Sequence, residues 1–307
     1  MDGKTVYMFP GQGSQSVGMR SKLGVMSEEL KEIFSVADYV LGFPLSALID
    51  TGPDEELTRT SNTQPALLVM GMAFSRALDE RDNRAEIVMG HSLGEYAALV
   101  YSGVIDFKDA VRIVRRRGEL MEKAVKNTPG KMAAVIGAER DRLESVIQEC
   151  KNDGVIEITN FNSPVQVVLS GEVTAVDRAV RMINEGGNGK AVELNVSAPF
   201  HSSLMKPVAD EFSLFLADFS FSRPRVQFID NVTGLTETDP ENIRKKLVLQ
   251  LSSPVQWERS VLTACEAGAG TFIESGPGTV LSGLVKRIVK DKKIVSGEKL
   301  LKGTVRI

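Results

Sequence analysis

Short runs of β-branched and aromatic residues alternate with longer stretches of helical periodicity along much of the chain. The strands that this pattern predicts are residues 5–9, 87–89, 226–229 and 271–274, and the helices are residues 65–78, 93–100, 107–126 and a stretch from about residue 280. Pro65 suits the first turn of its helix, and Asp106 is a typical N-cap. Strands that alternate with helices predict a mainly parallel sheet with helices on both faces.

The middle of the chain has a different order of elements. We predict strand 132–136, helix 141–150, strands 155–159 and 165–169, helix 173–185 and strand 190–194. This βαββαβ order is typical of a ferredoxin-like unit. Turn-forming residues border it, from Asn127 to Gly130 before and from Ser197 to Pro199 after. We therefore expect a large domain of residues 1–127 and 197–307, with a small subdomain of residues 128–196 inserted into it.

Composition excludes several classes of protein. The 307 residues are 42% apolar and 25% charged, with a net charge of −3, whereas a nucleic-acid-binding face needs an excess of basic residues. There is no basic start followed by a long apolar stretch, and no apolar run of about 20 residues, so we expect a cytoplasmic protein without a membrane partner. Two cysteines and two histidines are too few to predict a disulfide framework or a metal site.

The segment from Gly90 to Gly94 has the form GxSxG, with Ser92 at its centre. It follows a predicted strand and precedes a predicted helix, which is the context of a nucleophile elbow. Helix N–H groups converge there and would stabilise an oxyanion. The alternative is that Ser92 only caps the helix. His91 is adjacent in sequence, and its side chain is expected to point away and to serve packing.

A serine nucleophile needs a base, and His201 is the histidine that remains for this role. It follows Pro199, near the start of a helical pattern over residues 202–216. A helix N-terminus disfavours the imidazolium and would keep the ring neutral, as a general base requires. Taken alone, His201 could equally be an ordinary surface or core histidine.

Arg117 is out of place on its helix. At about 100° per residue, it falls within the apolar arc of helix 107–126, whereas Arg112, Arg115 and Arg116 fall on the opposite face. A buried guanidinium is costly without an anion. Either a carboxylate of the protein pairs with Arg117, or the carboxylate of a ligand does, held bidentately by the planar fork.

The glycine-rich segment 9–15 follows the first predicted strand. It is not a dinucleotide fingerprint, because residue 16 is serine, and it is not a P-loop, because Met19 follows Gly18. A glycine-flanked amide at the end of a strand suits donation of a backbone N–H to an oxyanion. A plain tight turn explains the local sequence equally well.

These residues together resemble the malonyl-CoA:acyl carrier protein transacylase family and the acyltransferase domains of polyketide synthases. The matching segments, in family order, are FPGQGSQ (9–15), TQPAL (63–67), GHSLGE (90–95), RG (117–118), NSP (162–164), APFH (198–201), Gln250, PVQW (254–257) and ESGPG (274–278). Each segment alone has low specificity, whereas the ordered set, which spans nearly the whole chain, is highly specific.

The resemblance implies a catalytic set. Ser92 would carry the acyl group, His201 would activate it, and the main-chain carbonyl of Gln250 would orient His201 without a carboxylate. The backbone N–H groups of Gln12 and Leu93 would form the oxyanion hole.

The resemblance also implies the residues that bind the acyl group. Arg117 would bind the free carboxylate of malonate, and Gln64 and Asn162 would lie near the site in supporting roles. Phe200 resembles the version found in malonyl-selective members.

The implied fold is an α/β-hydrolase-like core with the inserted ferredoxin-like subdomain. The implied activity is ping-pong transfer of malonyl from malonyl-CoA to acyl carrier protein for fatty acid synthesis, with no cofactor and no metal, by a monomer. The carrier is acidic in this family, so we expect a basic docking patch, with these candidates: Arg115, Arg116, Lys286, Arg287 and Lys290.

Three other functions compete with this one. A polyketide-pathway acyltransferase would share the same residues. A carboxylesterase or thioesterase would place an acid between Ser92 and His201 in the chain, and none there stands out as one that orients a base. A non-catalytic carrier-binding protein would not need the intact set of Ser92, His201 and Arg117.

Overall fold

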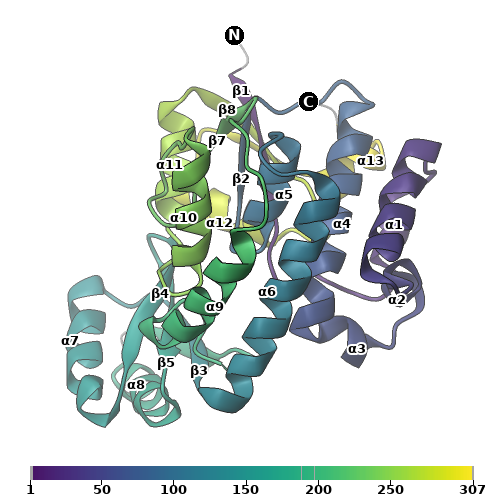
Figure 1. Ribbon diagram of the computed structural model, residues 1–307. Coiled ribbons are helices and arrows are strands. Elements are labelled where there is room, and N and C mark those ends of the chain that lie inside the picture. The colour runs from purple at the N-terminus through teal and green to yellow at the C-terminus, as the bar shows by residue number, and fades with distance from the viewer. Residues whose placement is uncertain (1–2, 188, 197, 306–307) are drawn as a thin grey trace.

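A computed structural model describes residues 3–187, 189–196 and 198–305. The chain folds into helices around a five-stranded sheet, with a separate four-stranded sheet to one side (Figure 1). The larger sheet is parallel throughout, in the order β7-β2-β1-β8-β9. Its strands are β1 (Lys4–Phe9), β2 (Ile87–Gly90), β7 (Gln227–Phe228), β8 (Ala269–Glu274) and β9 (Lys293–Ser296). The prediction of a mainly parallel sheet is confirmed, although β7 is shorter than expected and β9 was not predicted.

The central strand β1 explains why this sheet is covered on both faces. Tyr7 and Phe9 point into one hydrophobic core, and Val6 and Met8 point into another on the opposite face. Because successive side chains of a strand alternate between faces, a run of buried residues requires packing on both sides. The carboxyl ends of β1 and β2 therefore lie within the protein, next to the start of α5.

Helices cover the parallel sheet. Their bounds are α1 (Glu28–Leu41), α2 (Leu45–Thr51), α3 (Asp54–Thr58), α4 (Thr60–Asp79), α5 (Gly94–Tyr101), α6 (Phe107–Asn127), α9 (Lys206–Leu216), α10 (Pro240–Gln250), α11 (Trp257–Glu266), α12 (Val280–Ile288) and α13 (Gly297–Leu301). Short 3₁₀ turns are η1 (Met19–Leu23), η2 (Lys151–Asp153) and η3 (Ser203–Met205). Asp106 caps α6 as predicted, by accepting from the Lys108 backbone N–H at 2.8 Å.

The predicted start of α4 is wrong. The helix begins five residues earlier than expected, so that Pro65 lies inside it rather than in its first turn. Pro65 has no N–H for the carbonyl four residues before it, which is that of Ser61. Arg115 fills this gap, since its Nη1 donates to the Ser61 carbonyl at 3.0 Å.

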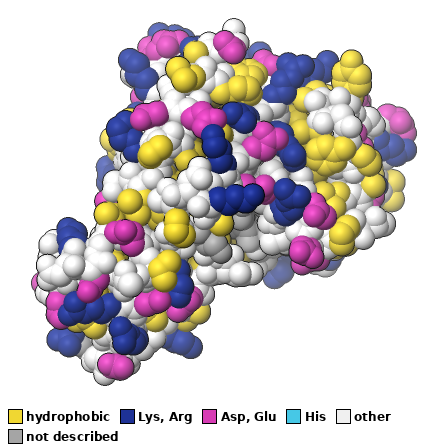
Figure 2. All heavy atoms as spheres, turned by 60° about the horizontal axis from the view of Figure 1, so that its bottom comes forward, with side chains coloured by type: hydrophobic (Ala, Val, Ile, Leu, Met, Phe, Trp, Pro, Cys, Tyr) yellow, Lys and Arg dark blue, Asp and Glu magenta, His cyan; other side chains and the backbone are white. Residues whose placement is uncertain are grey.

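The four-stranded sheet and its two helices form what we call the antiparallel unit. Its elements are β3 (Lys131–Ile136), α7 (Arg140–Cys150), β4 (Ile156–Ser163), β5 (Gln166–Gly171), α8 (Val173–Glu185) and β6 (Lys190–Glu193), in the strand order β4-β5-β3-β6. It has its own hydrophobic core, between the sheet and both helices. Figure 2 shows it as a smaller lobe beside the rest of the molecule. The predicted boundary residue Ser197 lies outside the described residues.

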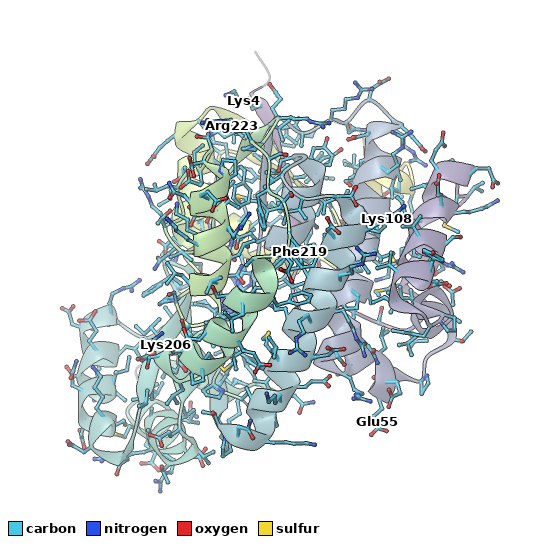
Figure 3. All side chains as sticks on the ribbon, viewed as in Figure 1. Lys4, Glu55, Lys108, Lys206, Phe219 and Arg223 are labelled. Carbon is cyan, nitrogen blue, oxygen red and sulfur yellow. The ribbon has the colours of Figure 1, made fainter. Side chains whose placement is uncertain are left out.

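Backbone hydrogen bonds join the antiparallel unit to the rest of the molecule along β4. In β4, the Phe161 N–H donates to the Val255 carbonyl at 2.9 Å, and the Val255 N–H donates to the Thr159 carbonyl at the same distance. Lys206, at the start of α9, lies beside the antiparallel unit, whereas Lys4 and Arg223 lie at the far end of the parallel sheet (Figure 3). Residues 198–205 thus lead from one unit back into the other.

No single helix within residues 3–187, 189–196 and 198–305 is long and apolar enough to cross a membrane. Helices α1 and α2 taken together are long and apolar enough, but they are bent by 117° at their junction.

Candidate active site

The turn between β2 and α5, residues 90–94, is called the elbow here. Ser92 sits at its apex with φ of +50°, which is strained for a residue other than glycine. The flanking glycines leave no room for side chains: a Cβ on Gly90 would lie 2.0 Å from the Gly94 carbonyl carbon, and a Cβ on Gly94 would lie 1.9 Å from the Phe9 carbonyl oxygen. The GxSxG spacing is therefore required by backbone packing, and it presents the serine at the end of the sheet.

Asn231, which the sequence did not indicate, holds the elbow on both sides of the serine. Its Oδ1 accepts from the Ser92 backbone N–H at 2.7 Å, and its Nδ2 donates to the Gly90 carbonyl at 2.6 Å. The side chain is 1% exposed. A strained backbone persists only where its surroundings fix it, and these two hydrogen bonds supply that constraint.

His201 contacts Ser92 directly. Its Nε2 lies 2.8 Å from Ser92 Oγ, and its Nδ1 lies 2.7 Å from the Gln250 main-chain carbonyl. Since a carbonyl only accepts, Nδ1 carries the proton and the Nε2 lone pair faces the serine hydroxyl. Burial, and then the positive charge of Arg117, lower the pKa of His201 to about 3, so the ring is neutral.

The helix that was expected to begin near residue 202 is preceded by a short turn. The 3₁₀ turn η3 comes first, and α9 begins only at Lys206. His201 itself adopts φ of +63°, a left-handed conformation that directs its ring into the site. The neutrality of this histidine therefore has burial as its main cause, rather than the helix terminus that we expected.

Arg117 points inward as the helical pattern predicted, and its side chain is fully enclosed, with 1% of the residue exposed. Its Nη2 donates to Ser92 Oγ at 3.2 Å and to Gln250 Oε1 at 2.9 Å, and its Nε has no hydrogen-bond partner within the described ranges. Among the described residues, no carboxylate lies within 4.0 Å of this guanidinium. Of the two possibilities that the sequence left open, direct pairing with a protein carboxylate is not what the structure contains.

Two backbone N–H groups have no hydrogen-bond acceptor in the part of the chain that the structure describes: that of Leu93, next to Ser92, and that of Gln12, in the loop after β1. The loop after β1 packs closely on the elbow, since a Cβ on Gly11 would lie 2.5 Å from the His91 carbonyl oxygen. A pocket of about 180 Å³ opens here between that loop, β4, β5 and α12. Free donors at the edge of a pocket can stabilise a developing negative charge.

The three residues to which the resemblance assigned supporting roles differ in their surroundings. Gln64 in α4 is buried, with Nε2 3.0 Å from Met121 Sδ, and its Oε1 has no hydrogen-bond partner among the described residues. Asn162 in β4 lies in the pocket wall and pairs through Oδ1 with His91 Nε2 at 2.8 Å. Because it pairs with Asn162, His91 turns away from Ser92. Phe200 is 7% exposed and belongs to the hydrophobic core on one face of the parallel sheet.

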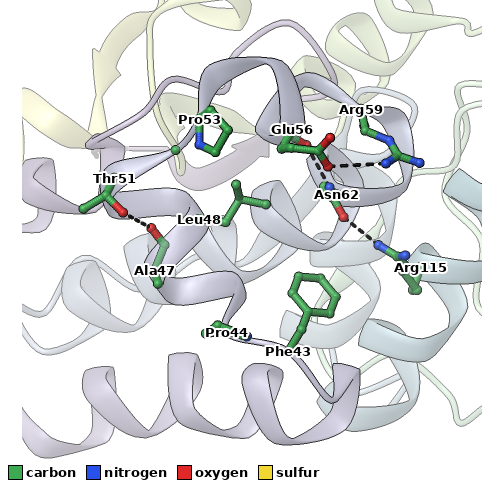
Figure 4. Close-up of a pocket in the computed structure, with 11 residues that line it drawn as sticks. Phe43, Pro44, Ala47, Leu48, Thr51, Pro53, Glu56, Arg59, Asn62 and Arg115 are labelled. Atoms are coloured by element: carbon green, nitrogen blue, oxygen red, sulfur yellow. Dashed lines mark hydrogen bonds and ion pairs between the residues drawn. The ribbon is translucent and has the colours of Figure 1, made fainter.

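A second pocket, of about 440 Å³, lies between α2, α3, α4 and α6 (Figure 4). Its two arginines have protein partners: Arg59 pairs with Glu56 at 3.3 Å, and Arg115 donates to Asn62 Oδ1 at 2.6 Å. Arg115 and Arg117 leave α6 on opposite sides, because two residues span about 200° of helix. This pocket is thus separate from Ser92, and its two arginines already form ion pairs with Glu56 and Glu119.

The functional groups of the site are those that acyl transfer uses, and they do not form a set of metal ligands. Within the described ranges, no group of three or more His, Cys, Asp or Glu side chains is placed to hold a metal ion. The arrangement offers a serine hydroxyl, a neutral imidazole oriented by a carbonyl, free N–H donors and an unpaired guanidinium.

Comparisons with known proteins agree with this chemistry. Residues 6–304 match the family described as acyl transferase domain. A malonyl CoA-acyl carrier protein transacylase from Escherichia coli K12 is 45% identical over 284 residues, 92% of each chain. One of the same name from Bacillus subtilis is 42% identical over 294 residues, which are 95% of this chain and 93% of that one.

Solved structures extend the similarity to the whole fold. An acyl carrier protein S-malonyltransferase from Vibrio cholerae superposes with a TM-score of 0.91 at 44% identity, covering 95% of this chain and 96% of that one. A malonyl-transacylase in complex with a type II PKS acyl-carrier protein gives a TM-score of 0.93 at 40% identity, covering 98% and 99%.

Proposed function

Because the chain belongs to the acyl transferase domain family, we infer that it is an enzyme that transfers the malonyl group of malonyl-CoA to the phosphopantetheine thiol of acyl carrier protein. The relatives that carry this activity in their names match nearly the full length of the chain. The residue roles that follow are our proposal, and they are argued from the geometry of the site.

In the first half-reaction, Ser92 Oγ attacks the thioester carbonyl and its proton passes to His201 Nε2, 2.8 Å away. The oxyanion forms at the free N–H groups of Gln12 and Leu93. When the C–S bond breaks, the imidazolium returns the proton to the departing thiolate of coenzyme A. The Gln250 carbonyl, which accepts from Nδ1, keeps the ring oriented throughout.

In the second half-reaction, the carrier thiol takes the place of coenzyme A. His201 accepts the thiol proton, and the sulfur attacks the malonyl-serine ester. The C–O bond then breaks, and Ser92 Oγ recovers a proton from the imidazolium. Both halves use the same groups in opposite directions, which is ping-pong transfer.

One observation carries the assignment of malonyl as the acyl group: the buried guanidinium of Arg117, which has no carboxylate partner among the residues that the structure describes, lies 3.2 Å from Ser92 Oγ. We propose that it binds the free carboxylate of malonate, which compensates the buried charge and anchors the acyl group. Gln64, whose Oε1 is unpartnered, and Asn162, in the pocket wall, support the acyl group and its thioester. Phe200 limits the space beside His201.

We also propose the finer description of the fold and its setting. Residues 1–127 and 197–307 form an α/β-hydrolase-like domain. Residues 128–196 form a ferredoxin-like subdomain, for which the βαββαβ order and the antiparallel pairing are the support. We propose that the enzyme works as a cytoplasmic monomer without a cofactor or a metal, since acyl transfer through serine needs neither.

The rival serine hydrolases of the α/β-hydrolase type use an Asp or Glu carboxylate to orient the histidine. Nδ1 of His201 is instead bonded to a carbonyl, which supports the transferase. The deciding experiment measures free malonate and malonyl-carrier after addition of malonyl-CoA, with and without carrier protein. A transferase releases little malonate and loads the carrier, whereas rapid malonate release without carrier would establish a hydrolase.

A second candidate pathway is polyketide synthesis, because one close structural relative was solved with a type II PKS acyl-carrier protein. We propose fatty acid synthesis as the main pathway. Comparison of kcat/KM for a fatty acid carrier and a polyketide carrier distinguishes the two.

Docking of the acidic carrier is proposed on α12 and the segment after it. Arg115 and Arg116 already pair with Glu119, and Arg116 also pairs with Glu211, so their charges are partly compensated. Lys286 and Arg287 lie on the helix whose first turn borders the pocket between the elbow and the loop after β1.

A further inference from the structure

Three buried side chains next to the elbow are linked in series by hydrogen bonds. The carboxyl group of Glu95 is at one end, the guanidinium of Arg117 is at the other, and the amide of Gln250 lies between them. Gln250 Oε1 accepts from Arg117 Nη2 at 2.9 Å, while Gln250 Nε2 donates to Glu95 Oε2 and to the Ser92 carbonyl. Each of the three residues is at most 2% exposed. One buried cation and one buried acid thus face each other across a single amide.

Neither ionisable group forms a direct ion pair within the described residues. The second oxygen of Glu95, Oε1, accepts from the Asn231 backbone N–H at 3.1 Å. Both carboxyl oxygens therefore accept from N–H donors, which is the arrangement that suits the ionised form. The neighbouring charged groups are already engaged elsewhere, since Asp230 is bridged to Lys246 at 2.8 Å.

We propose that Glu95 is a proton-exchanging counter-ion for Arg117, held one amide away by Gln250, and that it sets how strongly the arginine binds the acyl carboxylate. This inference rests on the proposed function and deepens it. A direct pair between Glu95 and Arg117 would occupy the guanidinium fork that the ligand needs. With the amide as a spacer, Glu95 leaves that fork open. Above about pH 8, where Glu95 is ionised, it compensates the buried charge of the arginine without a direct ion pair.

Binding of a malonyl group changes the charge balance of this chain. The ligand brings a second negative charge to a cavity that contains one cation, so Glu95 becomes protonated by solvent while Arg117 pairs with the ligand. Around Glu95, burial raises its pKa to about 8, and Asp230 raises it too, whereas Asn231, Gln250 and Arg117 lower it.

The sign of the pH dependence follows from these effects. A ligand carboxylate neutralises Arg117, removes its lowering effect and raises the pKa of Glu95 further. Glu95 is then ionised in the free enzyme above about pH 8 and must take up a proton to bind malonyl. Affinity for malonyl-CoA should therefore weaken as pH rises above that point. Tyr96 and His201, the other titratable side chains at this position, are a neutral phenol and a neutral imidazole at that pH.

The experiment is calorimetric titration of S92A, which binds acyl-CoA but cannot react, in buffers of different ionisation enthalpy at about pH 8.5. We expect malonyl-CoA to bind with uptake of a fraction of a proton per site, and acetyl-CoA to bind without that increment. Acetyl-CoA carries the same phosphates, so their titration cancels. Equal uptake for the two ligands overturns the proposal, and this measurement does not depend on any change at Glu95.

The variant E95Q in the S92A background should abolish the difference between the two ligands. In an otherwise wild-type chain, E95Q should keep a constant KM for malonyl-CoA at high pH, where the wild-type KM rises roughly tenfold by about pH 9.5. E274Q is the matched control, because Glu274 is a fully buried acid that bonds to the start of α12 at 2.9 Å and has no contact with Arg117. Proton uptake that persists in E95Q contradicts the proposal.

Failure of the proposed function has a different signature. In that case wild-type Ser92 acquires no malonyl group at any pH. A wild-type enzyme that is malonylated normally, yet shows the same pH profile as E95Q, refutes only the role of Glu95.

Discussion

The elbow and the polar layer beneath it, which comprises Glu95, Arg117, Asn231 and Gln250, hold the same serine by opposite means. At the elbow, backbone approaches backbone so closely that Gly90 and Gly94 cannot carry a Cβ. The polar layer instead consists of side-chain hydrogen bonds between α5, α6, α10 and the segment after β7. We therefore expect substitutions that add a side-chain atom to disrupt the elbow, and substitutions that remove a hydrogen-bonding group to disrupt the polar layer.

The largest effect should come from an atom added to the elbow. The Cβ of G94A would lie 1.9 Å from the Phe9 carbonyl oxygen, so β1 or α5 must move. We expect a loss of about 4 kcal/mol or more in the free energy of unfolding, together with loss of malonyl transfer. Urea denaturation measures the first and a transfer assay the second.

Gly283 supplies the control, because it lies in the interior of α12 with nothing within 4 Å of an added Cβ. G283A should be neutral or stabilising by about 0.5–1 kcal/mol. A G94A protein as stable as G283A would contradict the packing account of the elbow.

Removal of the buried cation from the polar layer should have the next largest effect. R117A leaves the malonyl carboxylate without a partner, so discrimination between malonyl-CoA and acetyl-CoA should fall on the order of 10²- to 10³-fold, equivalent to the loss of a buried charge pair. The measurement is kcat/KM for both substrates, with tolerance of acetyl-CoA increasing. R116A, which removes a half-buried arginine from the outer face of the same helix, is the matched control. Equal losses on both substrates would exclude a carboxylate-binding role.

Asn231 connects the two regions, and its variants separate them. N231A removes both hydrogen bonds to the elbow and leaves the Ser92 N–H unsatisfied, at a cost of about 2–3 kcal/mol in stability and a lower kcat. N231D retains the acceptor for Ser92 but loses the donor to the Gly90 carbonyl, so a smaller loss of kcat is expected. Variants with wild-type kcat would show that the elbow keeps its shape without this residue.

The smallest expected effect is the change in the free energy of unfolding for each unit of pH. The pKa of His201 is about 3 in the folded chain and ~6.5 in the unfolded chain, and burial also lowers the pKa of His91. As the pH falls below about 6.5, the unfolded chain binds these protons first, so stability that is fully present above that pH is lost toward pH 3. Each group contributes at most about 1.4 kcal/mol per pH unit.

His201→Asn should reduce this slope by the contribution of one group, as measured by urea denaturation at several pH values. An unchanged slope would mean that His201 is not the neutral buried base described above.

The elbow could be predicted from sequence because its cause is local. Strand, glycines, serine and helix follow one another within a few residues, and the glycines have a steric reason. Arg117 was also placed correctly, since helical periodicity assigns a face to each side chain of α6. The same argument would have indicated Glu95, the one charged side chain in the otherwise apolar α5.

The rest of the polar layer could not be predicted in this way. Asn231 follows a strand of only two residues, and its partners lie 139 and 141 positions away in the chain. Only the turn-forming composition of residues 230–234 marked the segment. The side chain of Gln250 depends on where α10 packs, which periodicity did not define. Contacts between distant segments have no local pattern in the sequence.

The central claim is that the unpaired guanidinium beside the serine receives the carboxylate of the acyl group. A crystal structure of the enzyme after reaction with malonyl-CoA tests it most directly. We expect electron density for a malonyl ester on Ser92, with its carboxylate within hydrogen-bonding distance of Arg117. A carboxylate that faces solvent, or a serine left unmodified while Arg117 stays in place, would contradict the account.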